Sequence, residues 1–302
     1  MAMNRTLFRK QLEPGLNTVF GLDYNQYKEE WRQFLDVETS QKAFEEDVLV
    51  TGFGAAPVKS EGAGIQYDTA KEAWTARYVH ETIALAFSIT HEAIKDNLYG
   101  NLGSKYAKAL ARSLNQTKEV KAANILNRAF NGVYKGGDGK ELCATDHPLD
   151  GGGTFSNESA TPVDLSEAAL EDACIEIAGF VDERGLPIQV MPKKLILPRQ
   201  LKFEAQRILY SDQRVGTGDN DQNALKETGM FPEGYCVIRR LTDPDAWFIK
   251  TDCPDGMKHI TREAVSTSTE VEFNTSNFRY KAMERYINGW TDPRGVYGSP
   301  GA

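Results

Sequence analysis

The segment AWTARYVHETIALAFSIT (residues 73–90) alternates between apolar and other side chains over an unusual length. Its odd positions Val79, Ile83, Leu85, Phe87 and Ile89 are apolar, and this period of two predicts a β-strand. At about 3.3 Å per residue, roughly 17 residues would span on the order of 55 Å, whereas ordinary strands have about 5 or 6 residues. A strand this long extends beyond any single compact core.

The first half of this strand suits a core poorly, because it carries Trp74, Arg77, Tyr78 and His80. We expect residues 65–67 to form its hairpin partner. Residues 51–64, TGFGAAPVKSEGAG, separate the chain before them from this hairpin and are typical of a turn or a mobile loop. The sequence therefore predicts a protruding hairpin.

Two segments that flank the hairpin also lack a self-sufficient core. Residues 1–50 mix aromatic side chains, among them Trp31 and Phe34, with charges, and a short helical pattern near residues 24–35 predicts an arm that packs on something else. Helices are expected at residues 91–98 and 104–130, the second capped by Ser104. A helix of roughly 27 residues would be about 40 Å long.

The middle of the chain has the pattern of a compact α/β unit. Asp164 and Glu167 form an expected capping box for a helix that Gly185 stops. A buried strand at residues 194–197 ends at Pro198, which can open the next helix. Further strands are expected at residues 235–240, 246–250, 267–273 and 278–287. Together with the long helix, these elements predict an α+β protein.

Composition restricts the class of protein. The 302 residues carry 43 acidic and 35 basic side chains, a net charge of −8, so no overall field draws the chain onto nucleic acid. We expect no membrane span and no signal peptide, and hence synthesis and retention in the cytoplasm. The cysteines are far apart and predict reduced thiols rather than a zinc or disulfide framework: Cys143, Cys174, Cys236 and Cys253.

Motifs for catalysis are missing from the sequence. Neither His80-Glu81 nor His91-Glu92 continues to a second zinc-ligating histidine, and Gly139-Lys140 is followed by Glu141 where a Walker loop needs Ser or Thr. Neither a dinucleotide fingerprint nor a GxSxG nucleophile motif occurs. We therefore expect no enzyme activity, no cofactor and no metal.

One loop leaves an alternative open. In CATDHPLDGGGTFSN (residues 143–157), Asp146, His147 and Asp150 could bind a metal, which would make the chain a cytoplasmic metal-dependent hydrolase. The favoured interpretation is structural. The two carboxylates would bond backbone amides in tight turns, and the glycines would supply positive φ for a change of direction between two subdomains.

The order of these elements resembles the major capsid proteins of tailed bacteriophages, which have the Hong Kong 97-like fold, and is most similar to the Mu-like major head subunit. Three passages carry the resemblance: LCATDHPLDGGGTFSN (residues 142–157), LILPRQLKFEAQRIL (residues 195–209) and RYINGWTDPRGVYG (residues 285–298). The resemblance implies an N-terminal arm (1–50), an extended loop (51–90), a peripheral domain with a spine helix (91–148 and 255–302) and an axial domain (149–254).

The resemblance also implies function and partners. The protein would be a structural capsid subunit that assembles with itself into hexamers and pentamers, and so into an icosahedral shell around double-stranded DNA. We expect a separate scaffolding protein and a portal, cement proteins as further partners, no membrane, and DNA held without sequence-specific contact or a dense Lys/Arg patch facing it. Assembly would take place in the bacterial host cytoplasm, and the product is the virion capsid. The expected subunit interface contains Trp31, Phe34, Trp74, Arg77, Tyr78 and His80.

Overall fold

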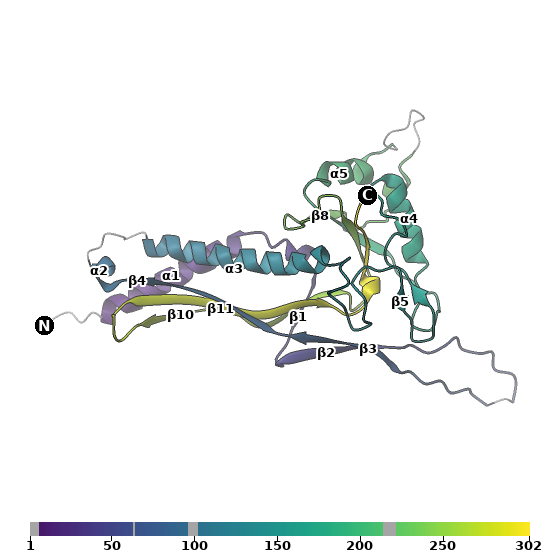
Figure 1. Ribbon diagram of the computed structural model, residues 1–302, viewed down its shortest axis with the longest axis horizontal. Coiled ribbons are helices and arrows are strands. Elements are labelled where there is room, and N and C mark those ends of the chain that lie inside the picture. Colours follow the sequence, from purple (N-terminus) through teal and green to yellow (C-terminus); the bar gives the residue numbers. More distant parts are fainter. Residues whose placement is uncertain (1–5, 63, 96–101, 214–221) are drawn as a thin grey trace.

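A computed structural model describes residues 6–62, 64–95, 102–213 and 222–302. The protein has a long body, a compact unit that rises from one end of it, and a hairpin loop that projects past that end (Figure 1). Its accessible surface is 17303 Å². A compact monomer of 33.6 kDa would expose about 12,700 Å². About a third more surface than usual therefore faces outward.

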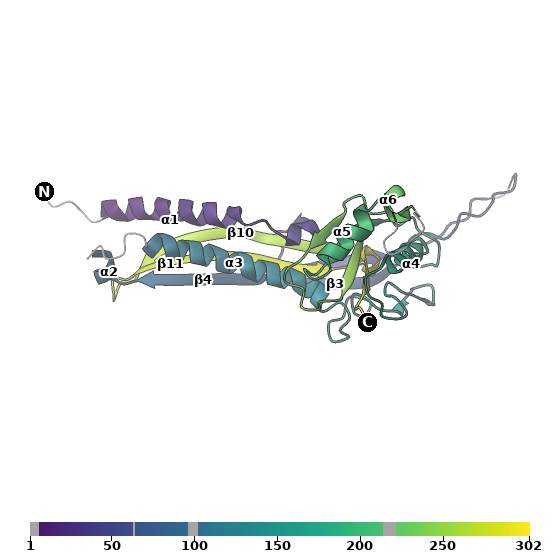
Figure 2. The ribbon, with the colours of Figure 1, turned by 90° about the horizontal axis from the view of Figure 1, so that it is seen from above.

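The long body is built on a four-stranded sheet in the order β1-β10-β11-β4. These strands are β1 (Asp36–Thr39), β10 (Met257–Val271), β11 (Phe278–Trp290) and β4 (Glu81–Ile89). β1 runs parallel to β10, and the other pairs are antiparallel. Helices α1 (Thr6–Gln26) and α3 (Leu102–Asn127) lie along this sheet, and the short α2 (His91–Lys95) follows β4 (Figure 2).

Alternation along β11 explains which face the helices cover. Phe278, Tyr280, Ala282 and Tyr286 are buried, whereas the residues between the first three of them are exposed. A core cluster joins the buried side chains of β11 to both helices. It consists of Leu16, Phe20, Tyr24, Ala107, Leu110, Ala111, Leu114, Phe278, Tyr280 and Ala282. The predicted arm thus packs on its own spine helix.

The compact unit, called here the axial unit, has a second sheet in the order β12-β9-β7-β8. Its strands are β7 (Pro192–Leu197), β8 (Tyr235–Val237), β9 (Trp247–Thr251) and β12 (Val296–Ser299). Helices α4 (Glu167–Ala178), α5 (Lys202–Tyr210) and α6 (Ala224–Glu227) belong to the same unit. Because β12 pairs with β9, the last residues join this sheet and not the long one.

The remaining elements lie where these parts meet. The hairpin pairs β2 (Phe44–Val50) with β3 (Glu72–Val79), and the described residues between them, 51–62 and 64–71, are called here the hairpin loop. The short strands β5 (His147–Pro148) and β6 (Thr154–Phe155) pair with each other. Single 3-10 turns, η1 and η2, occur at Trp31–Gln33 and Pro293–Gly295. Among the described residues, no helix is both long and apolar enough to cross a membrane.

The predicted over-long strand is in fact two strands, which is a correction. β3 and β4 are separated at His80 and pair with different partners, β2 and β11 respectively. Residues 65–67 form no strand, so the predicted hairpin partner was wrong. β3 buries even-numbered side chains such as Ala76 and Tyr78, whereas β4 turns the odd-numbered Ile83 and Phe87 toward the core. Val79 is therefore 60% exposed, and the apparent alternation through His80 joined two different faces.

Two other predicted helices have different bounds in the structure. The N-terminal helix ends at Gln26, so the helix expected at residues 24–35 was wrong, and only the 3-10 turn η1 lies beyond it. Helix α4 is capped by Ser166, whose side chain accepts from the amide of Ala169, and it ends at Gly179 rather than Gly185. Ser166 gives α4 the closer cap, which explains why the Asp164 capping box does not form.

The other predicted elements are confirmed, with small shifts of their ends. The spine helix, the strand–Pro–helix passage and the two later strands of the axial unit all form. β10 and β11 are longer than predicted. Of the helix expected at residues 91–98, α2 accounts for His91–Lys95, and the rest lies outside the described residues.

Candidate assembly surfaces

The six residues predicted to form the subunit interface divide into two groups. Trp31 and Phe34 are 2% and 1% exposed and belong to the core between α3 and the axial sheet. Tyr78 and His80 are also buried, and the Tyr78 hydroxyl donates to the carbonyl oxygen of Trp290 at 2.5 Å.

On the same strand β3, Trp74 is half-buried and Arg77 is exposed. The Arg77 guanidinium lies 4.2 Å from the centre of the Phe44 ring on β2. The interface stays a prediction. Of the predicted residues on this strand, Arg77 and, in part, Trp74 are accessible to a partner.

The hairpin loop exposes apolar side chains that the sequence did not single out as contacts. Val58 and Tyr67 are 98% and 92% exposed, and Phe53 and Ile65 are more than half exposed. A loop of small residues and glycine offers no neighbours that could cover such groups. Large apolar side chains within a segment of mostly small residues and glycine are the sequence signal that could have identified these contacts.

The base of the hairpin loop is held firmly. The amide of Thr51 donates to the carbonyl of Lys71, and the Lys71 amide donates to the Thr51 hydroxyl, both at 2.8 Å. Asp68 accepts from the amide of Gly54 at 2.8 Å and pairs with Arg184 of the axial unit at 2.7 Å. The amides of Gly54 and Thr69, with the Arg184 charge, hold the pKa of Asp68 below its usual value. The axial unit thus contacts the base of the loop through Arg184.

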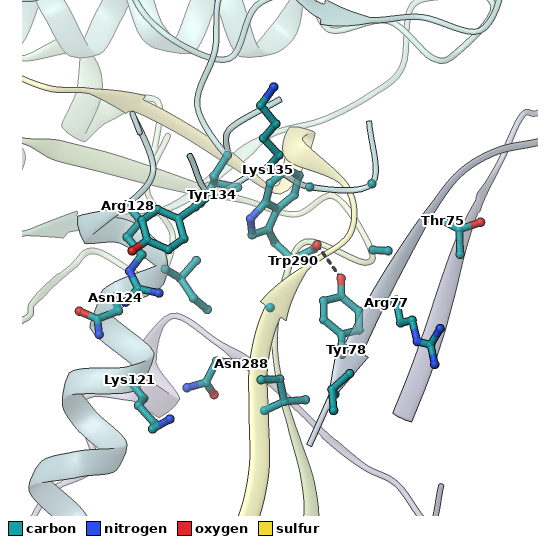
Figure 3. A pocket seen from close by; sticks show the side chains of 18 residues that line it. Thr75, Arg77, Tyr78, Lys121, Asn124, Arg128, Tyr134, Lys135, Asn288 and Trp290 are labelled. Atoms are coloured by element: carbon teal, nitrogen blue, oxygen red, sulfur yellow. Dashed lines mark hydrogen bonds between the residues drawn. The ribbon is translucent and has the colours of Figure 1, made fainter. Parts of the chain in front are cut away.

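A pocket of about 390 Å³ lies between β3, the end of α3 and the end of β11 (Figure 3). Four cationic side chains line it, and none of its lining residues is acidic: Arg77, Lys121, Arg128 and Lys135. Gly136 allows close approach here, because a Cβ at this position would lie 2.1 Å from the Trp290 indole. A pocket lined by cationic side chains therefore lies between the hairpin and the long body.

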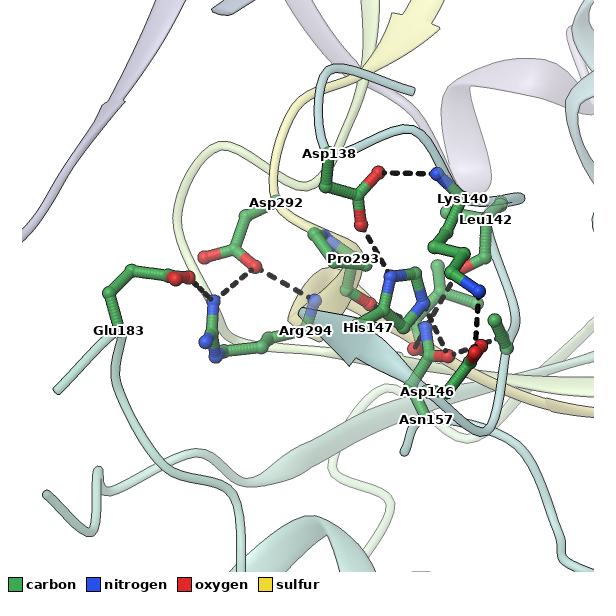
Figure 4. A network of polar contacts seen from close by, with 12 residues as sticks. Asp138, Lys140, Leu142, Asp146, His147, Asn157, Glu183, Asp292, Pro293 and Arg294 are labelled. Atoms are coloured by element: carbon green, nitrogen blue, oxygen red, sulfur yellow. Dashed lines mark hydrogen bonds and ion pairs between the residues drawn. The ribbon is translucent and has the colours of Figure 1, made fainter. Parts of the chain in front are cut away.

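The glycine-rich loop holds its histidine within the chain. The His147 ring is fully buried, and its Nδ1 lies 2.6 Å from Asp138 while its Nε2 lies 3.0 Å from the side-chain oxygen of Asn157 (Figure 4). Both ring nitrogens are therefore already bonded within the chain. In the described part of the chain, no three His, Cys, Asp or Glu side chains are grouped to hold a metal.

The carboxylates of this loop do not behave as predicted. Asp146 forms an ion pair with Lys140 rather than bonding a turn amide, which lowers the pKa of Asp146. Asp150 is exposed, and its amide donates to Glu183 at 3.3 Å. Gly152 and Gly153 both have φ near 92°, so the predicted positive φ is confirmed for these two glycines.

Asn157 and Arg294 connect this loop to the end of the chain. The Asn157 amide group donates to the carbonyls of Leu142, Pro293 and Val296 at 2.7–3.0 Å. Arg294 is 2% exposed, pairs with Glu183 at 2.8 Å and lies over the Phe155 ring. Two of the passages that carry the family resemblance therefore meet in one buried network, which bonds the segment after α3 to the connection between β11 and β12.

Comparisons with known proteins agree with this architecture. The phage capsid protein family matches residues 72–299. The comparison with curated proteins gave no match. The closer likeness to the Mu-like major head subunit stays a prediction.

Solved structures show the same fold at low identity. A virus-like particle from Pyrococcus furiosus is 11% identical, with a TM-score of 0.55 over 94% of this chain and 97% of that one. The capsid of a native GTA particle is 12% identical, with a TM-score of 0.54 over 90% of both chains. The procapsid of bacteriophage JBD30 is 12% identical, with a TM-score of 0.53 over 98% of this chain and 76% of that one. With its Hong Kong 97-like fold, the chain belongs to the phage capsid protein family and is a structural capsid protein.

Proposed function

We propose that this protein is the major capsid subunit of a tailed phage, and that its copies join as hexamers and pentamers into an icosahedral shell around double-stranded DNA. The observation that carries the proposal is the excess of surface, 17303 Å² against about 12,700 Å² for a compact monomer. An interface of ordinary size buries about 800 Å² per partner. The excess of about 4,600 Å² is enough for several neighbours around each copy.

The hairpin loop supports contact between different surfaces of neighbouring copies. Its side chains Val58 and Tyr67 are 98% and 92% exposed and belong to none of the core clusters of their own chain, so a neighbouring subunit must cover them if they are covered at all. Contacts of one surface with a different surface close into rings when the rotation fits. With Trp74 and Arg77 on β3, this loop forms the proposed head-to-tail contact.

The proposed division into domains rests on the same contacts between neighbouring copies. The arm, the extended loop and the peripheral domain would make contacts along the shell, and the axial unit would meet its copies around five-fold and six-fold positions. The subunit acts without catalysis. A scaffolding protein and a portal would direct assembly in the host cytoplasm, and cement proteins could bind the finished virion.

Electron microscopy of the purified protein, alone and with a co-expressed scaffolding protein, tests the proposal. Closed particles or rings of five and six subunits are expected. A protein that stays monomeric under both conditions, at every concentration reached, would contradict it.

A further inference from the structure

A second cleft occupies the corner between the spine helix and the axial unit. Its volume is about 740 Å³, and its walls come from α3, the segment after α1, the start of α5 and the end of β8. Six of its lining residues are cationic: Lys28, Arg112, Arg199, Lys202, Arg239 and Arg240. Two, Glu30 and Glu119, are acidic. This local excess of four positive charges occurs in a chain whose net charge is −8.

The two carboxylates are already engaged inside the chain. Glu119 accepts from the backbone amides of Glu30 and Trp31 at 2.7 and 3.2 Å. Glu30 pairs with Arg239 and Arg240 at 3.3 and 3.4 Å. Within the described ranges, this leaves four cations without an ion pair: Lys28, Arg112, Arg199 and Lys202. All four are exposed.

A stripe on α3 continues the cleft. Lys105, Lys108 and Arg112 are exposed and follow one another at the three- and four-residue spacing that places side chains on one helix face. They cover about 10 Å along the helix axis. The single carboxylate of α3 is Glu119, which is buried in the floor of the cleft. The cations therefore form a track along the helix into the corner.

The lining favours phosphate over a protein partner. The centre of a protein interface is depleted of charge and contains apolar anchors. Apart from two tyrosines, the apolar lining of this cleft is Cys236 and Val237. Phosphate backbones are instead contacted by Arg, Lys, Tyr and amide side chains, and Tyr27, Tyr235, Gln33 and Gln116 line the cleft beside the cations.

We propose that this cleft and the α3 stripe contact the phosphate backbone of the packaged double-stranded DNA, so that the α3 side of the subunit faces the interior of the shell. This inference rests on the proposed function. It modifies the expectation that no dense cationic patch faces the DNA. About six contacts per subunit, four in the cleft and two more from Lys105 and Lys108, keep the attachment sensitive to salt, because each neutralised phosphate contributes about −0.9 to the slope of log affinity against log salt.

Fluorescence anisotropy of the full-length protein with a short labelled duplex tests this inference. With six contacts, affinity is expected to fall about 1,800-fold between about 50 and 200 mM salt. The affinity of the variant Arg199→Gln/Lys202→Gln should fall about 150-fold over the same range, because two contacts are lost. The control Arg279→Gln/Lys281→Gln removes the same charge from exposed positions on β11 and should behave as the wild type.

Two results would overturn the inference. Equal loss of salt dependence in both variants would mean that net charge, and not the cleft, attracts DNA. Binding of a polyglutamate peptide at the cleft without binding of the duplex would assign it to an acidic protein segment. Particle formation by the same variants, examined by electron microscopy, is a separate readout, so failure of DNA contact is distinguishable from failure of the capsid proposal.

Discussion

The axial unit and the hairpin loop place their large apolar side chains in opposite environments. In the axial unit, Leu170, Leu195 and Trp247 are 0% exposed and belong to one core cluster. In the hairpin loop, Val58 and Tyr67 are 98% and 92% exposed. The first region has a complete core of its own, whereas the second has hydrogen bonds and an ion pair at its base and no core.

This difference separates two sources of stability. Burial of apolar surface stabilises a protein by about 25 cal/mol per Å², and the axial unit buries such surface within its own chain. The hairpin loop can bury its apolar side chains only against another molecule. Substitutions in the two regions should therefore change different measurements, unfolding in one case and assembly in the other.

The largest effect on unfolding is expected in the axial core. Trp247→Ala removes a side chain that is 0% exposed and whose indole donates to the Val163 carbonyl at 3.0 Å. The free energy of unfolding should fall by about 4 kcal/mol in denaturant titrations. Phe203→Ala on α5, where the side chain is 72% exposed, is the control and should change it by less than about 0.5 kcal/mol. If both variants lost the same free energy of unfolding, the expected contrast between buried and exposed side chains of this unit would be wrong.

A somewhat smaller effect is expected at the junction network. Asn157→Ala leaves the carbonyls of Leu142, Pro293 and Val296 without their common donor. Because buried unsatisfied groups cost about 1–3 kcal/mol each, unfolding should become easier by about 3 kcal/mol. Asn274→Ala in the exposed turn after β10 is the matched control. If both variants unfold alike, Asn157 does not join the two parts of the chain.

The axial unit could be predicted well from the sequence and the hairpin could not. In residues 194–209, a buried strand, a proline and a helix follow one another locally, and periodicity captures local elements. β3 and β4 differ in partners that lie far apart in the sequence, so alternation alone merged them into one strand. The buried network was missed for a similar reason, because Asn157 and Arg294 are more than 130 residues apart and are joined only when Asn157 bonds Pro293 and Val296 in the folded chain.

A third prediction concerns pH. His259 is buried between Trp31 and Tyr286, with Arg32 and Lys118 nearby, and burial lowers its pKa to about 4 although Asn288 bonds its ring. The unfolded chain binds the proton below about pH 6.5 and the folded chain only near pH 4, so folding loses stability as pH falls through this range. Because His259→Gln lacks this titration, the free energy of unfolding of the wild type should fall by about 2 kcal/mol relative to that of the variant between pH 7 and 4.5.

Chemical denaturation of both proteins at each pH measures this gap. The difference between them cancels other titrating groups, including Glu119, whose pKa burial raises to about 7 and which works in the opposite direction. A gap that stays constant with pH would mean that His259 is not kept neutral by its surroundings. The hairpin loop should contribute nothing to this effect.

The smallest effect on unfolding is expected in the hairpin loop. Val58→Ser and Tyr67→Ser remove exposed apolar groups, so the free energy of unfolding should change by less than about 0.5 kcal/mol. Particle yield, measured by sedimentation, should nevertheless fall sharply, because these groups are proposed to pack on a neighbouring subunit. Lys59→Ser, between them in the same loop, is the control. Normal particle yield in both apolar variants would exclude the loop from assembly.

Backbone hydrogen exchange of residues 55–62 and 64–67, beyond the bonded base of the loop, tests the dependence of this region on its neighbours most directly when dispersed subunits are compared with closed particles. We expect rapid exchange in the dispersed protein and strong protection in the particles, while residues 193–197 of β7 are protected in both. Equal protection of the loop in both states would show that it is stabilised within its own chain, contrary to this account.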